Sequence, residues 1–247
     1  MNNTGLVSVS FRGLTPEQVA SAAEKAGLPC VEWGSDVHAP WDNGEKLAEV
    51  CRAQKAHGLR CCSYGTYFRL TVTPMEELPG YIRAAKTLGT DILRLWCGTK
   101  KREDCTEEER AFLMAQCCEA AKIAEAEGVT LCLECHRNSY TETKEGALDV
   151  MQTVDSPAFR MYWQPNQYRT IEENIEYARL LKDYITHIHV FQWKEKLRFP
   201  LREGIAEWKR YLAELPGAHM LLLEFMPDDD VASLPEEARA LRELKGE

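Results

Sequence analysis

The chain has 247 residues, which is long enough for one large α/β domain and is the usual size of a complete (β/α)₈ barrel. Its formal net charge of -9 argues against nucleic acid as a partner, because phosphates attract basic surfaces. No stretch approaches the roughly 20 apolar residues of a membrane span, and no signal-peptide pattern opens the sequence. We therefore expect a cytoplasmic protein, without a membrane partner, that acts on a small molecule.

Short apolar runs alternate with amphipathic stretches along the whole chain, as is typical of repeated βα units around a parallel sheet. Helix starts carry capping signals, such as Thr15-Pro16-Glu17 and the capping box of Thr106 and Glu109. The expected strands are residues 6–11, 30–36, 59–68, 92–97, 129–136, 159–164, 185–191 and 219–226. The expected helices cover residues 15–27, a stretch ending at 58, then 73–89, 106–128, 143–154, 170–184, 205–215 and 235–244.

Eight such units predict a single TIM-barrel domain over residues 1–247. The alternative is a doubly wound open sheet, which should have fewer strands and a glycine-rich phosphate loop after the first one. The sequence there is Arg12-Gly13-Leu14-Thr15, which does not contain that loop. The strand count and the length together favour the closed barrel.

Polar residues end several of the apolar strands. In barrels of this class the active site lies at the carboxyl ends of the strands, so these positions are the first candidates for chemistry. Side chains alternate across a strand, so Glu134 shares a face with His136, and His187 with His189. The strand-end residues are Glu134, His136, Gln164, His187, His189 and Glu224.

Two of these residues are glutamates that follow three apolar residues, and a buried carboxylate must be paired, protonated or bound to a metal. An alternative is that Glu134 and Glu224 form buried salt bridges to arginines such as Arg94 or Arg12, with the histidines satisfied in the core. Four polar residues at neighbouring strand ends favour the metal. The set of two carboxylates, an amide oxygen and an imidazole suits Mn²⁺, Mg²⁺ or Co²⁺ better than zinc. The proposed ligands are Glu134, Gln164, His189 and Glu224.

Other residues are candidates for contact with a substrate. His38 lies just past the second strand, where a role in the pocket and a hydrogen bond that stabilises the loop are equally compatible with the sequence. Trp96, near the end of the fourth strand, is expected either to pack in the barrel or to form an apolar pocket wall.

The order and spacing of six segments resemble the sugar phosphate isomerase/epimerase family, which contains tagatose 3-epimerase, hydroxypyruvate isomerase, inosose dehydratase and, more distantly, endonuclease IV. The segments are 31–38, 92–98, 131–136, 186–190, 198–204 and 221–224. The resemblance implies a xylose isomerase-like barrel with a Glu, Asp, His, Glu metal quartet, in which His189 is the ligand and His187 its neighbour.

The resemblance also implies that Glu134 and Glu224 act as an acid and base pair. One would remove a proton alpha to a carbonyl and the other return it through a cis-enediolate, while the metal polarises the oxygens. The protein would then be an isomerase or epimerase of a small sugar, sugar phosphate or keto-acid. The expected substrate contacts are His38, Trp96 and His136, from their places at or just past strand ends, and Gln167 and Arg198, from the resemblance.

The chain departs from the family pattern at two positions. Gln164 replaces the usual aspartate and should weaken metal binding, and Gln167 replaces a histidine that often contacts substrate. Arg198 lies in a basic segment, residues 194–202, that could equally be an exposed charged loop.

Two other functions stay open. One is dehydration of an inositol-like or sugar-like ketone at the same site, and the other is a barrel that binds a polyol without turning it over. An endonuclease IV-like hydrolase is disfavoured, because its three-metal site needs more histidine and aspartate ligands than six scattered histidines provide. A homodimer also stays open, since it would need an exposed apolar patch.

Overall fold

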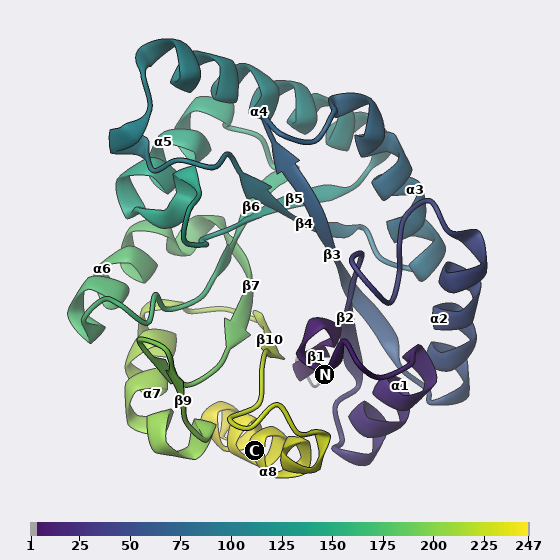
Figure 1. Cartoon of the computed structure of the whole chain (residues 1–247). Coiled ribbons are helices and arrows are strands. Elements are labelled where there is room, and N and C mark those ends of the chain that lie inside the picture. The colour runs from purple at the N-terminus through teal and green to yellow at the C-terminus, as the bar shows by residue number, and fades with distance from the viewer. Residues whose placement is uncertain (1–3, 247) are drawn as a thin grey trace.

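Eight parallel strands close into a barrel in the computed structural model, which describes residues 4–246 (Figure 1). The barrel strands are β1 (Thr4–Val7), β2 (Cys30–Gly34), β3 (Arg60–Leu70), β4 (Ile92–Cys97), β5 (Thr130–Glu134), β6 (Phe159–Trp163), β7 (Ile185–Val190) and β10 (Met220–Leu223). They are hydrogen-bonded in the closed order β1-β10-β7-β6-β5-β4-β3-β2. The predicted (β/α)₈ barrel is therefore confirmed. The expected domain of residues 1–247 includes residues 1–3 and 247, which lie outside the described residues.

The eight helices form a ring around the strands, and α8 closes the ring against α1 (Figure 1). None of the described helices has the length and apolar character needed to cross a membrane. The helices are α1 (Pro16–Lys25), α2 (Gly44–Ala56), α3 (Leu78–Leu88), α4 (Glu107–Glu127), α5 (Lys144–Val154), α6 (Ile171–Leu181), α7 (Ile205–Glu214) and α8 (Leu234–Lys245).

Local sequence explains where most helices start and stop. Thr15 and Thr106 each accept a hydrogen bond from the backbone of the residue three positions on, and the side chain of that residue bonds back to the threonine N–H. Helices α3 and α4 end at Gly89 and Gly128, whose φ angles of 87° and 65° favour glycine. The capping signals of the sequence therefore act as predicted at these positions.

The helix expected from residue 73 starts later. A 3₁₀ turn, Met75–Glu77, precedes α3, and Pro79 lies in the first turn of that helix. Proline has no N–H to bond to the preceding turn, so it is tolerated near a helix start and not farther inside. The Thr73-Pro74 signal therefore marks a turn rather than the helix itself.

The first strand is also shorter than expected. It ends at Val7, where the pairing with its neighbours stops, and Ser8–Phe11 forms a 3₁₀ turn. The Ser8 hydroxyl accepts the N–H of Gly34, and the Ser10 hydroxyl accepts the N–H of Phe225. The basic segment, residues 194–202, was expected as a loop, but part of it is in strands. β8 (Trp193–Lys194) and β9 (Leu197–Arg198) form a short antiparallel hairpin there.

His57 joins α1 to α2 outside the barrel. Its Nε2 lies 2.7 Å from Glu17 Oε1 and its Nδ1 lies 2.7 Å from Glu24 Oε2. Hydrogen bonds to Glu24 and Glu17 raise the pKa of His57. A group whose pKa is raised on folding stabilises the fold fully below its unfolded pKa, and this contribution is lost as pH rises through the folded pKa.

We therefore expect His57→Gln to lower the melting temperature most at about pH 6, below the unfolded pKa of histidine, and progressively less as the pH rises toward about pH 9. Thermal unfolding followed by circular dichroism across this range measures the effect. The Glu17→Gln, Glu24→Gln double variant is the matched control and should lose the same pH dependence. A difference between wild type and His57→Gln that stays constant with pH would contradict the assignment.

Candidate active site

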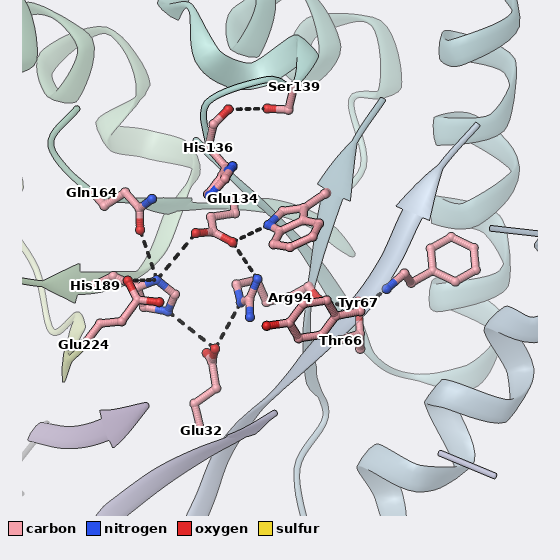
Figure 2. A network of polar contacts seen from close by, with 12 residues as sticks. Glu32, Thr66, Tyr67, Arg94, Glu134, His136, Ser139, Gln164, His189 and Glu224 are labelled. Atoms are coloured by element: carbon pink, nitrogen blue, oxygen red, sulfur yellow. Dashed lines mark hydrogen bonds and ion pairs between the residues drawn. The ribbon is translucent and has the colours of Figure 1, made fainter. Parts of the chain in front are cut away.

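The proposed metal ligands come together at the carboxyl ends of four neighbouring strands (Figure 2). Glu134 is the last residue of β5, His189 lies in β7, and Gln164 and Glu224 directly follow β6 and β10. One ligand atom from each of Glu134, His189 and Glu224 lies within 4.8 Å of the others, and all three side chains are buried. The structure thus brings the four residues to one place.

His189 points one ring nitrogen at the centre of this cluster. Its Nδ1 lies 3.1 Å from Gln164 Oε1, 3.5 Å from Glu224 Oε2 and 3.8 Å from Glu134 Oε1. One imidazole nitrogen and three oxygens therefore face a common point, and this donor set fits a divalent cation.

Glu32 is a part of the site that the sequence analysis missed. It lies on β2, fully buried, with Oε1 3.4 Å from His189 Nε2 (Figure 2). Ser63 donates a hydrogen bond to its other oxygen at 2.7 Å. The carboxylate of Glu32 is thus an ion-pair partner for Nε2 of His189, while Nδ1 faces the cluster.

Arg94, on β4, links Glu32 to Glu134. Its Nε donates to Glu32 Oε1 at 3.0 Å and its Nη1 to Glu134 Oε2 at 2.5 Å. Trp96 Nε1 donates to the same Glu134 oxygen at 2.5 Å. Glu134 therefore does form the buried salt bridge to Arg94 through Oε2. Its Oε1 still faces His189, so the salt bridge is compatible with a role as metal ligand.

The two glutamates of the pair differ in their surroundings. Burial alone would raise the pKa of Glu134, but Arg94, with help from His136 and His189, lowers it to about 2. The carboxylate of Glu224 accepts no hydrogen bond from any described residue, and burial together with the negative charge of Glu134 raises its pKa. One carboxylate is thus held ionised, while the other has the higher proton affinity.

The charges around His189 oppose the effect of burial on its pKa. Burial lowers the pKa of the imidazole, but Glu224 and Glu32 more than compensate and raise it to about 9. His187, two residues earlier, lies deeper in the barrel and stacks on the ring of Tyr162 with 5.0 Å between the centroids. Of the two histidines in β7, only His189 belongs to the cluster.

A cavity of about 420 Å³ adjoins the cluster and includes Glu134, Gln164 and Glu224 in its wall. Three of the expected substrate contacts also line it. They are Trp96, His136 and Gln167.

Two expected substrate contacts lie elsewhere. His38 is buried between the Ser8 hydroxyl, at 3.1 Å, and the carbonyl of Leu14, at 3.0 Å, so its contacts are those of a loop-stabilising residue. Arg198 forms an ion pair with Asp229 and lines a neighbouring hollow. The structure does not bring His38 or Arg198 to the wall of the 420 Å³ cavity, because both are used in loop contacts.

The fold agrees with the comparisons with known proteins. The model of one family, described as xylose isomerase-like TIM barrel, matches residues 20–244. The chain belongs to this family. Among curated proteins, none matches the chain.

Several solved structures resemble this xylose isomerase-like barrel over its full length. The probable 3-DHS dehydratase AsbF from Bacillus anthracis, involved in petrobactin synthesis, has a TM-score of 0.82 at 18% identity, over 98% of this chain and 99% of that chain. IolI, solved with a zinc atom, has a TM-score of 0.74 at 16% identity, over 99% and 96%. D-psicose 3-epimerase from Clostridium cellulolyticum H10, solved with D-tagatose, has a TM-score of 0.73 at 14% identity, over 100% and 99%. At these identities the likeness concerns the fold.

Proposed function

We propose that this xylose isomerase-like barrel is a metal-dependent isomerase or epimerase of a small sugar, sugar phosphate or keto-acid. The observation that carries the proposal is the convergence of His189 Nδ1 and three side-chain oxygens beside an open cavity. A divalent ion held by Glu134, Gln164, His189 and Glu224 would polarise the carbonyl and hydroxyl oxygens of the substrate.

Glu134 and Glu224 are the groups that would move the proton. Arg94 and Trp96 fix one oxygen of Glu134, and this leaves the other free toward the cluster. Glu224 follows β10, on the other side of β7 from β5, and its carboxylate accepts no hydrogen bond from the described residues. It can therefore take up or release a proton without breaking a hydrogen bond. One carboxylate would remove the proton alpha to the carbonyl and the other would return it.

The proposal is tested first with metal and then with solvent exchange. Mn²⁺, Mg²⁺, Co²⁺ and Zn²⁺ are titrated calorimetrically into protein freed of metal by chelation, with Zn²⁺ included because IolI was solved with it. The loaded protein is then incubated in D₂O with ketoses, ketose phosphates and keto-acids. We expect metal binding, deuterium at the carbon next to the carbonyl, and a product of unchanged composition. Absence of both metal binding and exchange would overturn the proposal.

A dehydratase is the second candidate, and the TM-score of 0.82 to AsbF over nearly the whole of both chains favours it. Dehydration of a hydroxyketone also begins with removal of a proton alpha to a carbonyl, so the same residues could serve it. The NMR spectrum of the product separates the two reactions, because dehydration loses water. Binding of metal and sugar without any exchange would instead identify a barrel that only binds.

Gln164 should limit the affinity for the metal, because it contributes an amide oxygen where a carboxylate would add a negative charge. We expect Gln164→Asp to tighten Mn²⁺ binding by roughly tenfold. Gln164→Asn is the matched control, since it has the same shortened side chain without the charge, and it should not tighten binding. Calorimetric titration at fixed pH measures both variants. Equal affinities for the two would show that Gln164 does not act through its missing charge.

A further inference from the structure

Not every polar side chain in the cavity wall belongs to the metal cluster. Arg137 and Asn138 lie in the loop after β5, and Gln167 lies in the loop after β6. The Arg137 guanidinium stacks on the ring of Tyr168, 4.2 Å from its centroid, which joins the two loops. These three residues, Arg137, Asn138 and Gln167, form what we call the donor patch.

The side chains of the donor patch have no polar partners among residues 4–246. No described carboxylate lies within ion-pair distance of Arg137, and neither side-chain amide takes part in a hydrogen bond there. Two other donors in the same wall are already used, since Arg94 and Trp96 both donate to Glu134. The donor patch therefore offers a cationic guanidinium and two amide N–H groups to a molecule bound in the cavity.

The charges in the site also point to an anion. With His189 neutral, as a metal ligand must be, Glu32, Glu134 and Glu224 carry three negative charges against one positive charge on Arg94. A divalent ion would bring this group to neutrality. Arg137 then adds a positive charge that no carboxylate of the described chain cancels.

The other lining arginine is neutralised. Arg12 forms an ion pair with Asp36 and belongs to the loop after β1, on the far side of the barrel from β5. A second cation, Arg69, stacks on Trp96 and donates to the carbonyl of Asn138, so it adds positive charge behind the cavity wall near the donor patch. The excess positive charge therefore lies on the side of Arg137.

We infer that the substrate carries an anionic group, a carboxylate or a phosphate, that the donor patch binds while the reacting carbons face the metal cluster. This inference rests on the proposed function and assigns the substrate class of the same site. A guanidinium matches either anion with two parallel N–H donors, and the amides of Asn138 and Gln167 supply further donors to its oxygens. The stacking on Tyr168 limits the freedom of Arg137 before binding, which reduces the entropy lost when the anion binds.

Three probes that differ only at carbon 6 test the inference. D-fructose, D-fructuronate and D-fructose 6-phosphate are titrated calorimetrically into the Mn²⁺-loaded and the metal-free protein. We expect at least one anionic probe to bind roughly tenfold or more tightly than D-fructose, and Arg137→Gln to remove that preference. Tighter binding of D-fructuronate would identify a carboxylate site and tighter binding of D-fructose 6-phosphate a phosphate site, and each result supports the inference.

Arg239→Gln, on the exposed face of α8, is the control for the change in net charge and should keep the preference. Circular dichroism confirms that each variant is folded. Failure of both anionic probes to bind more tightly than D-fructose, or a preference that survives in Arg137→Gln, would overturn the inference.

The two proposals fail in different ways. An anion preference without metal binding or deuterium exchange would overturn the proposed function but support the donor patch as an anion site. Deuterium exchange into D-fructose as fast as into the anionic probes, with equal affinities for all three, would support the proposed function but overturn the inference that the donor patch binds an anion.

Discussion

Replacing Glu224 with glutamine should lower kcat/KM of the proton transfer by roughly 10²- to 10⁴-fold, the range expected when a positioned acid or base is lost. Glutamine has nearly the same shape and keeps an oxygen for the metal, but it cannot take up and return a proton. The rate of deuterium incorporation from D₂O into the best of the ketose, ketose phosphate and keto-acid probes measures the effect.

Stability separates a lost catalytic group from a damaged fold. Glu224 accepts no hydrogen bond from the described residues and burial raises its pKa, so its neutral replacement should lower the melting temperature of the metal-free protein less than a replacement of Glu134 does. Glu134→Gln should lose activity as well, but it should also destabilise, because Arg94 and Trp96 lose a shared charged acceptor. Glu119→Gln, exposed on α4, is the control for the change in charge. Undiminished exchange in Glu224→Gln would contradict the assignment of the pair.

Much of this site could be predicted from the sequence because of where polar residues interrupt apolar strands. Glu134 and Glu224 each end an apolar run, and their depth in the strand places them at the carboxyl end of a barrel. His189 could be chosen over His187 only through the family spacing, since both share one face of β7. The structure separates the two by depth.

Glu32 could not be assigned to the site in the same way. Strands of a parallel barrel are buried on both faces, so the period-2 pattern does not tell which side chains point inward. Its partners, Arg94 and His189, are far away along the chain and meet it only across the closed barrel. A charged residue within an otherwise apolar strand was the available signal.

The loops were the least predictable part. His38 and Arg198 were expected at the site, but the turn after β1 and the β8–β9 hairpin use them in contacts that the sequence does not encode locally. Arg137 was overlooked for the opposite reason, since an exposed arginine in a loop is usually only solvated. Arg137 becomes a candidate for substrate binding because it lines the cavity and stacks on Tyr168.

The largest effect on stability is expected at Arg94, which is buried between two carboxylates. Arg94→Met should lower the free energy of unfolding of the metal-free protein by roughly 3–5 kcal/mol at pH 7, the cost of leaving a buried ion pair without one partner. Glu32 and Glu134 would remain about as buried as before, without the cation that they share. Urea denaturation in the presence of a chelator measures the loss.

The sign of the pH dependence identifies the cause. Burial would raise the pKa values of both Glu32 and Glu134. The charges of His189 and Arg94 lower the pKa of Glu32, and Arg94 is the main group that lowers the pKa of Glu134, so both lie below their usual range. Carboxylates of this kind stabilise the fold above their unfolded pKa, and that stability is lost as pH falls through the folded value. The difference between wild type and Arg94→Met should therefore shrink between pH 7 and pH 4, as the carboxylates of the variant take up protons.

A divalent ion can replace part of the missing charge. Saturating Mn²⁺ should therefore raise the melting temperature of Arg94→Met by more than that of the wild type, because the variant's site is more negative. Adding Glu32→Gln to Arg94→Met removes one of the two stranded carboxylates, so the double variant should be more stable than Arg94→Met alone. A loss of stability that is independent of pH, of Mn²⁺ and of Glu32 would mean that Arg94 acts only by filling space in the barrel.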